Sequence, residues 1–256
     1  MPTDVTRGDY EPAFRAYIFQ VRYLKELGET FEASNYNFKA LVREIVKSDY
    51  YRAKNIDTVD AQRQLELQGI GTAVLLGPER LNRKIIATTG VEWRVNDRSQ
   101  LLSDNAYFSL YGGLDYSSTT VRPTELNSVG AGIARRMSNE VACLATAADF
   151  AKPVGERLLF PQVEVTDVPG AADAQIRDNI AHLYWQVLGE KVDANGEDVD
   201  IAFSLFQDVY NDATANGNNL PGRCRSGDIQ NDPNGTVRAW MAVVSFKLAD
   251  QQFLFE

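Results

Sequence analysis

The chain has 256 residues, and its 44% of apolar side chains supports a substantial core, which excludes an intrinsically disordered protein. Its formal net charge of −9 repels phosphate backbones and argues against a nucleic-acid partner. The single histidine, His182, and the two cysteines, Cys143 and Cys224, form no cluster of zinc ligands, and the Cys-x-x-Cys-His motif of covalent haem is missing.

The sequence predicts no transmembrane span. Its apolar runs, such as Ala239–Phe246, are far shorter than the roughly 20 residues that a bilayer-crossing helix needs. The first residues, Met1–Asp4, lack the charged-then-apolar pattern of a signal peptide. Two interpretations stay open at this point: a cytoplasmic protein, or a mature fragment whose leader has been removed.

The predicted elements are almost all helices. Apolar residues at three- and four-residue spacing predict a first helix that begins near Pro12 and stops at Gly28, and a second over 38–47. A third helix is expected over 77–90, between its opening Gly-Pro and its closing glycine. A short fourth helix is expected near 99–110.

The second half of the chain contains the best-defined predicted helix, over 127–150. Its apolar residues form one stripe, and its small residues permit close packing against another helix. Three further amphipathic patterns predict helices over 171–188, 198–213 and 236–249.

Strand signals are confined to Tyr116–Val121 and Gln162–Val168, too few for a central sheet. The sequence therefore predicts a mainly α fold: an irregular multi-helix bundle with long loops and little or no β-sheet. An N-terminal helical pair over 1–55 is expected ahead of a main helical domain over 56–256, unless the two form one continuous domain.

The two cysteines lie in different surroundings. Cys143 belongs to the predicted helix over 127–150, and Cys224 to a loop. A bridge between them would close a loop of about 80 residues and stabilise the fold by roughly 4–5 kcal/mol in the chain-entropy description. The alternative is two unrelated reduced thiols.

The segment Tyr111–Arg122 (YGGLDYSSTTVR) has the composition of a binding loop. Its paired glycines permit close approach of the backbone to a ligand. Asp115 and Arg122, with the hydroxyl groups between them, could converge on a polar ligand such as a sugar, with Tyr111 and Tyr116 as stacking faces. The alternative is a structural turn at the glycines, with the aspartate paired to the arginine.

Oxygen-bearing side chains at one- and two-residue spacing in 193–200 suggest a calcium loop, since calcium takes about six to eight oxygen ligands. The candidate ligands are Asp193, Asn195, Asp198 and Asp200. The EF-hand pattern is not met, because Gly196 falls at the fourth position of the loop rather than the sixth. The alternative is an acidic helix start that offsets the helix dipole. Residues 228–235 form a weaker candidate of the same kind.

Glycoside hydrolysis needs two carboxylates and no histidine. On the predicted helix over 127–150, Glu140 and Asp149 are the carboxylates to inspect, and salt bridges to nearby arginines are the alternative. His182 lies between apolar residues of another predicted helix and is expected to be structural.

Six phrases occur in order along most of the chain: Asn37–Arg52, Leu76–Ile85, Leu110–Asp115, Arg136–Cys143, Arg157–Pro161 and Val237–Val244. The first resembles the phrase that closes a helical module in the planctomycete-cytochrome-associated proteins. These are large exported bacterial proteins built from several domains of unknown function. The other phrases are similar to segments of proteobacterial relatives of those proteins.

This resemblance implies export to the periplasm or the cell exterior, and with it a Cys143–Cys224 bridge. It also implies a protein partner in an exported assembly, with a c-type cytochrome as the candidate. The family supplies no established catalytic residues. We therefore expect a non-catalytic binding or scaffolding module that needs no cofactor other than, at most, calcium. The alternative is a carboxylate-based hydrolase that acts on polysaccharide, with Asp115 or Glu140 in its site.

Overall fold

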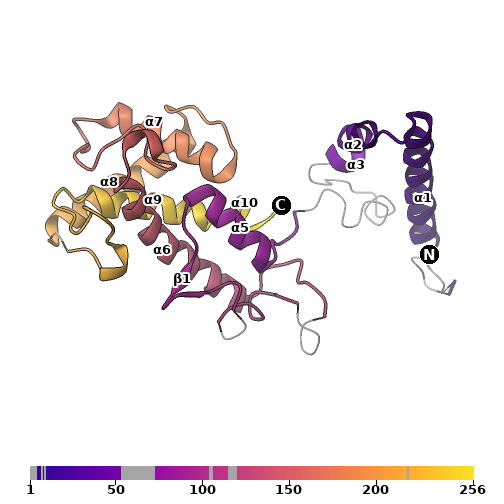
Figure 1. The fold of residues 1–256 in the computed structure, drawn as a ribbon, viewed down its shortest axis with the longest axis horizontal. Helices are drawn as coiled ribbons and strands as arrows, with labels where there is room; N and C mark the ends of the chain where they lie inside the picture. The colour runs from indigo at the N-terminus through magenta and orange to yellow at the C-terminus, as the bar shows by residue number, and fades with distance from the viewer. Residues whose placement is uncertain are drawn as a thin grey trace. The chain divides into compact units, whose positions relative to one another are not determined.

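The structure is a computed structural model, and it describes residues 5–6, 8, 10–52, 73–103, 106–114, 120–217 and 219–256. It is mainly α-helical, which confirms the predicted fold class (Figure 1). The chain divides into two compact units, residues 1–73 and 74–256, called here the N-terminal unit and the main unit. The domain boundary predicted between residues 55 and 56 lies outside the described residues.

The N-terminal unit contains α1 (Tyr10–Ala33), α2 (Phe38–Lys47) and α3 (Asp49–Arg52). α2 has the predicted bounds, but the predicted stop of the first helix at Gly28 is wrong. A glycine inside a helix costs only about 1 kcal/mol relative to alanine, and half-buried Leu27 and Phe31 hold the helix on either side of it. The chain turns instead at Asn35 and Tyr36, which both adopt positive φ.

The main unit contains α5 (Pro78–Thr89), β1 (Arg94–Val95), β2 (Arg98–Ser99), α6 (Ser128–Phe150), α7 (Asp173–Leu183), α8 (Glu197–Ala215), α9 (Thr236–Leu248) and α10 (Gln251–Leu254). Two 3-10 turns, η1 (Val154–Glu156) and η3 (Gly222–Cys224), lie in its loops, and a π-helical turn, η2 (Tyr184–Leu188), continues α7. The helices expected over 77–90, 127–150, 198–213 and 236–249 are confirmed to within two residues at each end. The helix expected over 171–188 is α7 together with η2.

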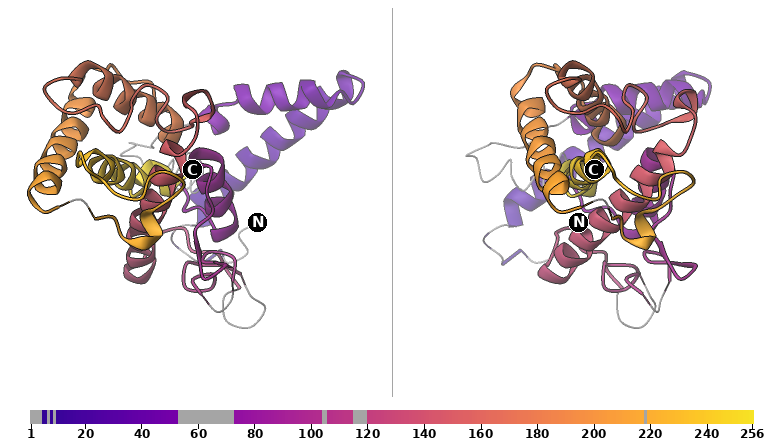
Figure 2. Two further views of the ribbon diagram at one scale, coloured as in Figure 1. Left: turned by 60° about the vertical axis from the view of Figure 1, so that its left-hand side comes forward. Right: turned by 90° about the vertical axis from the view of Figure 1, so that its left-hand side faces the viewer.

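The core of the main unit lies where α9 packs against both α6 and α8 (Figure 2). Trp240 of α9 is fully buried there, with its ring 5.2 Å from that of Phe160 and 4.7 Å from that of Phe206. Phe160 stacks in turn on Phe150, the last residue of α6, at 4.2 Å. Such aromatic contacts add to the free energy of apolar burial.

The two ends of the main unit are tied together. The backbone of Val74 and that of Glu256 exchange two hydrogen bonds, of 2.7 and 3.0 Å. Leu76 N donates to Leu254 O at 2.9 Å. Phe253, the residue before Leu254, is fully buried. The C-terminal residues therefore pack onto the main unit and help to hold the entry to α5.

The helix expected near 99–110 is wrong. Arg98 and Ser99 instead form β2, which pairs with β1 in an antiparallel ribbon. The ribbon turns at Asn96 and Asp97, which have φ of 50° and 60°, and such positive angles suit a tight hairpin turn. Residues 106–112 form successive turns, with Tyr107 N bonded to Gln100 O at 2.9 Å.

The strand expected over 162–168 is also wrong. The carbonyl oxygen of Val163 accepts from Arg157, and that of Val165 accepts from the side chains of Asn234 and Thr236. Side chains thus occupy the backbone groups that a neighbouring strand would need. Of the strand expected over 116–121, residues 116–119 lie outside the described part, and 120–121 are not in a strand.

Candidate functional site

The predicted binding segment partly surrounds a pocket of about 360 Å³ in the main unit. Tyr111 and Arg122, the two ends of the predicted segment, both line it. Asp115 and Tyr116 lie outside the described residues, so their places in the site stay predictions. The other side chains that bear on the pocket's polarity are Ser109, Glu125 and Asn127, the last of which caps α6.

Arg122 is held on one side by the start of α5. Its Nη2 lies 3.4 Å from Oε1 of Glu79, and its guanidinium packs directly against the backbone of Gly77. A Cβ atom at residue 77 would overlap Nη1 of Arg122. The absence of a side chain at Gly77 therefore makes room for the guanidinium beside the pocket.

The paired glycines of the segment have structural reasons. Gly112 adopts φ of 99° and packs against the ring of Pro123, and a Cβ at Gly113 would overlap the ring of Phe108. Both glycines are buried. The turn interpretation thus accounts for the glycines themselves, but Gly112 caps no helix, because residues 106–112 form turns.

Tyr111 is the polar side chain of this pocket that is most deeply buried. It is 2% exposed, and its hydroxyl finds no hydrogen-bond partner among the residues that the structure describes. Burial raises the pKa of the hydroxyl, so it stays protonated.

Glu140 is held in a polar network, because its carboxylate accepts three hydrogen bonds. The donors are Trp93 Nε1 at 2.8 Å, Arg136 Nε at 3.0 Å and Arg223 Nη1 at 2.9 Å. Burial opposes ionisation of Glu140, but these hydrogen bonds and the two guanidinium charges outweigh it and lower the pKa of the carboxyl. Arg136 also donates to Tyr107 Oη at 2.6 Å.

Cys143 and Cys224 form a disulfide, with their Cα atoms 4.8 Å apart. The bridge lies one turn along α6 from Glu140, and Arg223 is the residue before Cys224. The disulfide and the Arg223–Glu140 ion pair therefore fasten the 3-10 turn η3 to α6 at adjacent points. A smaller pocket of about 210 Å³, lined in part by Glu140 and Arg223, lies between this attachment and the β1–β2 turn.

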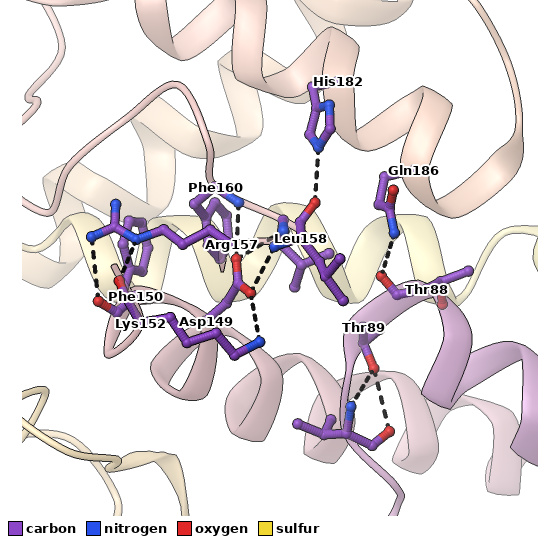
Figure 3. A network of polar contacts seen from close by, with 12 residues as sticks. Thr88, Thr89, Asp149, Phe150, Lys152, Arg157, Leu158, Phe160, His182 and Gln186 are labelled. Atoms are coloured by element: carbon purple, nitrogen blue, oxygen red, sulfur yellow. Dashed lines mark hydrogen bonds and ion pairs between the residues drawn. The ribbon is translucent and has the colours of Figure 1, made fainter. Parts of the chain in front are cut away.

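Asp149 is fully buried at the end of α6, where it fixes the following loop (Figure 3). Its Oδ1 accepts from Leu158 N at 2.9 Å, and its Oδ2 accepts from Leu159 N at 2.8 Å and Phe160 N at 3.0 Å. Lys152 Nζ pairs with Oδ1 at 3.2 Å. Asp149 therefore has a structural role, and its buried carboxylate is closed to a substrate.

His182 belongs to the same network. Its Nε2 lies 2.8 Å from the carbonyl oxygen of Leu158, and a carbonyl can only accept, so Nε2 carries the proton (Figure 3). One turn further along, Gln186 Nε2 donates to Thr88 O at 3.0 Å and ties η2 to α5. The bond from His182 to Leu158 therefore helps to hold α7 against the loop over 157–160.

The predicted calcium ligands are only partly brought together. Asp193 Oδ1 accepts from Asn195 N at 2.9 Å, while Asp200 pairs with Arg177 at 2.7 Å. Within the described part of the chain, no three His, Cys, Asp or Glu side chains gather closely enough to hold a metal ion. Calcium binding here stays a prediction. In the weaker candidate, Asp232 is buried and accepts from Val237 N at 3.0 Å at the start of α9.

Lys247 is a buried cation that was not among the residues predicted from the sequence. The residue is 1% exposed, and its Nζ lies 3.1 Å from the centre of the Tyr184 ring in η2. Burial lowers its pKa to about 8, against the opposing effect of Asp250, Asp198 and Glu190. Its only sequence signal is a charged residue inside the apolar stripe of α9.

We expect Lys247→Met to flatten the dependence of stability on pH in mildly alkaline solution. Because the folded-state pKa of about 8 lies below the ordinary 10.5, the unfolded chain holds a proton that the native protein has lost between these values. The free energy of unfolding contributed by this group therefore rises with pH across that window. Urea unfolding from pH 7.5 to 9.5 measures the slope, with exposed Lys191→Met as the matched control.

That pH range avoids Tyr184. Burial first, then nearby carboxylates, raise its pKa to about 12, so its contribution to stability is lost only above the ordinary pKa of 10. Equal slopes for Lys247→Met and the unaltered protein would contradict the assignment to Lys247.

Comparison of the chain with known protein families, curated proteins and solved structures gave no match. Among the described residues, no helix is both long and apolar enough to cross a bilayer.

Proposed function

We propose that the chain is a non-catalytic binding module of an exported bacterial protein assembly, and that α2 is the helix that docks the partner. The observation that carries this proposal is the exposed apolar face of α2. At about 100° per residue, its apolar side chains share one continuous face of the helix. They are Phe38, Leu41, Val42, Ile45 and Val46.

This face lacks the burial that an apolar face normally has. Phe38 is 69% exposed, Val42 41% and Val46 44%, and α2 contains no buried residue. In the described part of the N-terminal unit, Ala16 alone is buried. Contiguous exposed apolar surface is typical of interaction sites, and an amphipathic helix that enters an apolar groove is a common mode of recognition.

The charges of α2 favour a partner with an acidic rim. Lys39 borders the apolar face, and Arg43 and Lys47 continue from it toward the opposite side of the helix. Glu44 is the single acid in the helix, and it lies 3.8 Å from the amino group of Lys47. A chain of net charge −9 thus presents a locally basic, apolar helix. Charge complementarity of this kind speeds association and selects the partner.

The contacts of Glu140 and Asp149 support a binding role over the polysaccharide hydrolase. A glycosidase needs two carboxyl groups that reach the scissile bond from either side. Glu140 accepts from three side chains, and Asp149 is closed off by three backbone N–H groups and a lysine. Asp149 is therefore closed to a sugar, and the lowered pKa of Glu140, which lines the pocket of about 210 Å³, suits a carboxylate that stays ionised rather than an acid that protonates a leaving group.

Export is supported by two independent features. The Cys143–Cys224 disulfide suits an oxidising compartment such as the periplasm or the cell exterior. The resemblance to the planctomycete-cytochrome-associated proteins points the same way, and on that ground we propose a c-type cytochrome as the partner.

The experiment compares capture of c-type cytochromes from a native periplasmic fraction by the full chain and by Phe38→Asp/Val42→Asp. We expect the unaltered chain to retain a haem-staining protein, and the double variant to retain at least tenfold less. The matched control is Val154→Asp, an exposed valine of the main unit.

Three results would overturn the proposal. Equal capture by the two chains would remove α2 from docking. Binding of α2 to anionic lipid vesicles with no protein captured would reassign it to a membrane surface. Release of reducing sugar from polysaccharide by the unaltered chain, lost in Glu140→Gln, would establish the hydrolase.

A further inference from the structure

α1 has a stripe of apolar residues that follows the pattern of a coiled coil. Successive members are alternately four and three residues apart, and the stripe is called here the α1 seam: Tyr10, Phe14, Tyr17, Val21, Leu24 and Gly28. This alternation repeats every seven residues, which is the spacing that packs one helix along another. The helix is long enough for such packing, since its 24 residues span about 36 Å.

The described residues of the N-terminal unit do not bury the α1 seam. The face of α1 that packs inside the unit contains buried Ala16 and also Tyr23, whose ring lies 4.6 Å from that of Tyr50 in α3. At 100° per residue, the seam lies about a third of a turn away from that face. Val21 is 43% exposed and Leu24 65%, and the three aromatic members of the seam are only half-buried.

The α1 seam is complementary to itself when two copies of α1 run antiparallel. In one register, each aromatic side chain lies opposite a smaller residue of the second copy: Tyr10 opposite Gly28, Phe14 opposite Leu24, and Tyr17 opposite Val21. A Cβ atom at Gly28 would meet no described side chain within 4 Å. The ring of Tyr10 from a second copy can therefore fill the space beside Gly28, as the large and small side chains of a packed interface do.

The same register brings opposite charges together beside the seam. Glu11 of each copy lies opposite Lys25 of the other, whereas a shift by seven residues sets Glu11 opposite Glu32, which repels it. Within one copy, Glu11 and Lys25 have ion pairs of their own, with Arg15 at 2.6 Å and Glu29 at 3.8 Å. All four side chains are more than half exposed, so these pairs are weak and do not prevent contacts with a second copy.

We infer that the chain forms a two-fold symmetric dimer in which the α1 seams of two copies pack antiparallel. A two-fold interface uses the same surface on both copies, so that surface must be complementary to itself, as the α1 seam is. The inference does not rest on docking by α2, because the seam belongs to α1 and shares no residue with the apolar face of α2. A dimer carries two such faces and so gains avidity for a partner that offers two sites.

Sedimentation equilibrium of the full chain over a concentration series tests the dimer. We expect a species of twice the chain mass of 28.5 kDa. Val21→Asp/Leu24→Asp places four charges in the seam of the dimer and should raise the dissociation constant roughly a hundredfold or more. The matched control is Phe19→Asp, because Phe19 is 54% exposed on the side of α1 opposite the seam, and this variant should stay dimeric.

Two further variants test the antiparallel register. Ile18 lies beside the seam and meets Ile18 of the second copy in this register, so mild oxidation of Ile18→Cys should link two chains through a disulfide. Lys25→Glu should weaken the dimer, because it sets two acids opposite each other, and Glu11→Lys/Lys25→Glu should restore it. In a parallel pair these residues do not meet, so neither the disulfide nor the restoration would be observed.

The dimer is overturned if the unaltered chain sediments as a monomer at every concentration, or if Val21→Asp/Leu24→Asp associates as tightly as the unaltered chain does. A dimer whose Ile18→Cys variant forms no link between chains would overturn the antiparallel register. Phe38→Asp/Val42→Asp should stay dimeric, which separates failure of this inference from failure of the docking proposal. Loss of the dimer in that variant would assign self-association to α2 and overturn the role of the α1 seam.

Discussion

Removal of the Cys143–Cys224 disulfide is expected to lower the free energy of unfolding by about 4–5 kcal/mol. The bridge joins residues 81 apart in sequence, and a cross-link across so long a loop removes much of the conformational entropy of the unfolded chain. For a unit of this size, a loss of that order lowers the melting temperature by roughly 10–15 °C. The ion pair of Arg223 with Glu140 then remains as the attachment of η3 to α6.

The measurement is urea unfolding of Cys143→Ala/Cys224→Ala beside the unaltered chain, with and without reductant. Alanine is chosen because both sulfur atoms lie in an apolar cluster with Leu220 and Val237. Reductant should destabilise the unaltered chain to the level of the double variant and leave the variant unchanged. Two free thiols in the native protein, or a double variant of unaltered stability, would contradict the expectation.

Substitution of Asp149 by Ala is expected to destabilise the main unit by about 3–5 kcal/mol. Three backbone N–H groups lose their acceptor, and two of them, at Leu159 and Phe160, are buried. Phe160 stands between Phe150 and Trp240 in the core, so a displaced loop also loosens the aromatic packing.

Asp149→Asn retains the shape and one acceptor, so we expect it to lose less than the alanine variant. Exposed Glu156→Gln, a carboxylate of the same loop, is the matched control and should lie within about 0.5 kcal/mol of the unaltered chain. Should both Asp149 variants unfold at the urea concentration of this control, Asp149 would not hold the loop in the way described.

The helices of this fold could be predicted where the signal is local. α5 is bounded by Pro78 and by Gly90, which adopts φ of 74°, and both residues are typical of helix ends. The apolar stripes of α6 and α9 repeat over several turns, and those helices form the core. The disulfide was also among the possibilities from the sequence, but the two cysteines alone left free thiols equally open, and only the resemblance favoured the bridge.

The contacts that determine the site are not local, and they could not be predicted. Asp149 bonds to residues nine to eleven positions away, and Glu140 bonds to Trp93 and to Arg223, which is 83 positions away. Spacing within a helix gives no information on such partners. Burial of Lys247 could not be predicted for the same reason, since its ammonium group lies over the ring of Tyr184, which belongs to η2 and not to α9.

Two errors have a local cause. The Asn96-Asp97 pair is a hairpin signal, because both residues adopt positive φ more readily than most, and the helix predicted from residue 99 began inside the ribbon that this turn forms. The alternating pattern of Gln162–Val168 suits a strand, but no segment pairs with it in the described part of the chain. A pattern of apolar residues specifies a strand only when a partner strand is present.

The central claim is that the interior polar groups hold the fold together while the exposed face of α2 binds a partner protein. Photo-crosslinking in the periplasm tests it most directly, with a photoreactive amino acid at Phe38 and, as control, at Val154. The account predicts a covalent adduct with one haem-containing protein from position 38 and none from position 154. Adducts from position 154 alone, or none from either position in cells that express the haem protein, would contradict it.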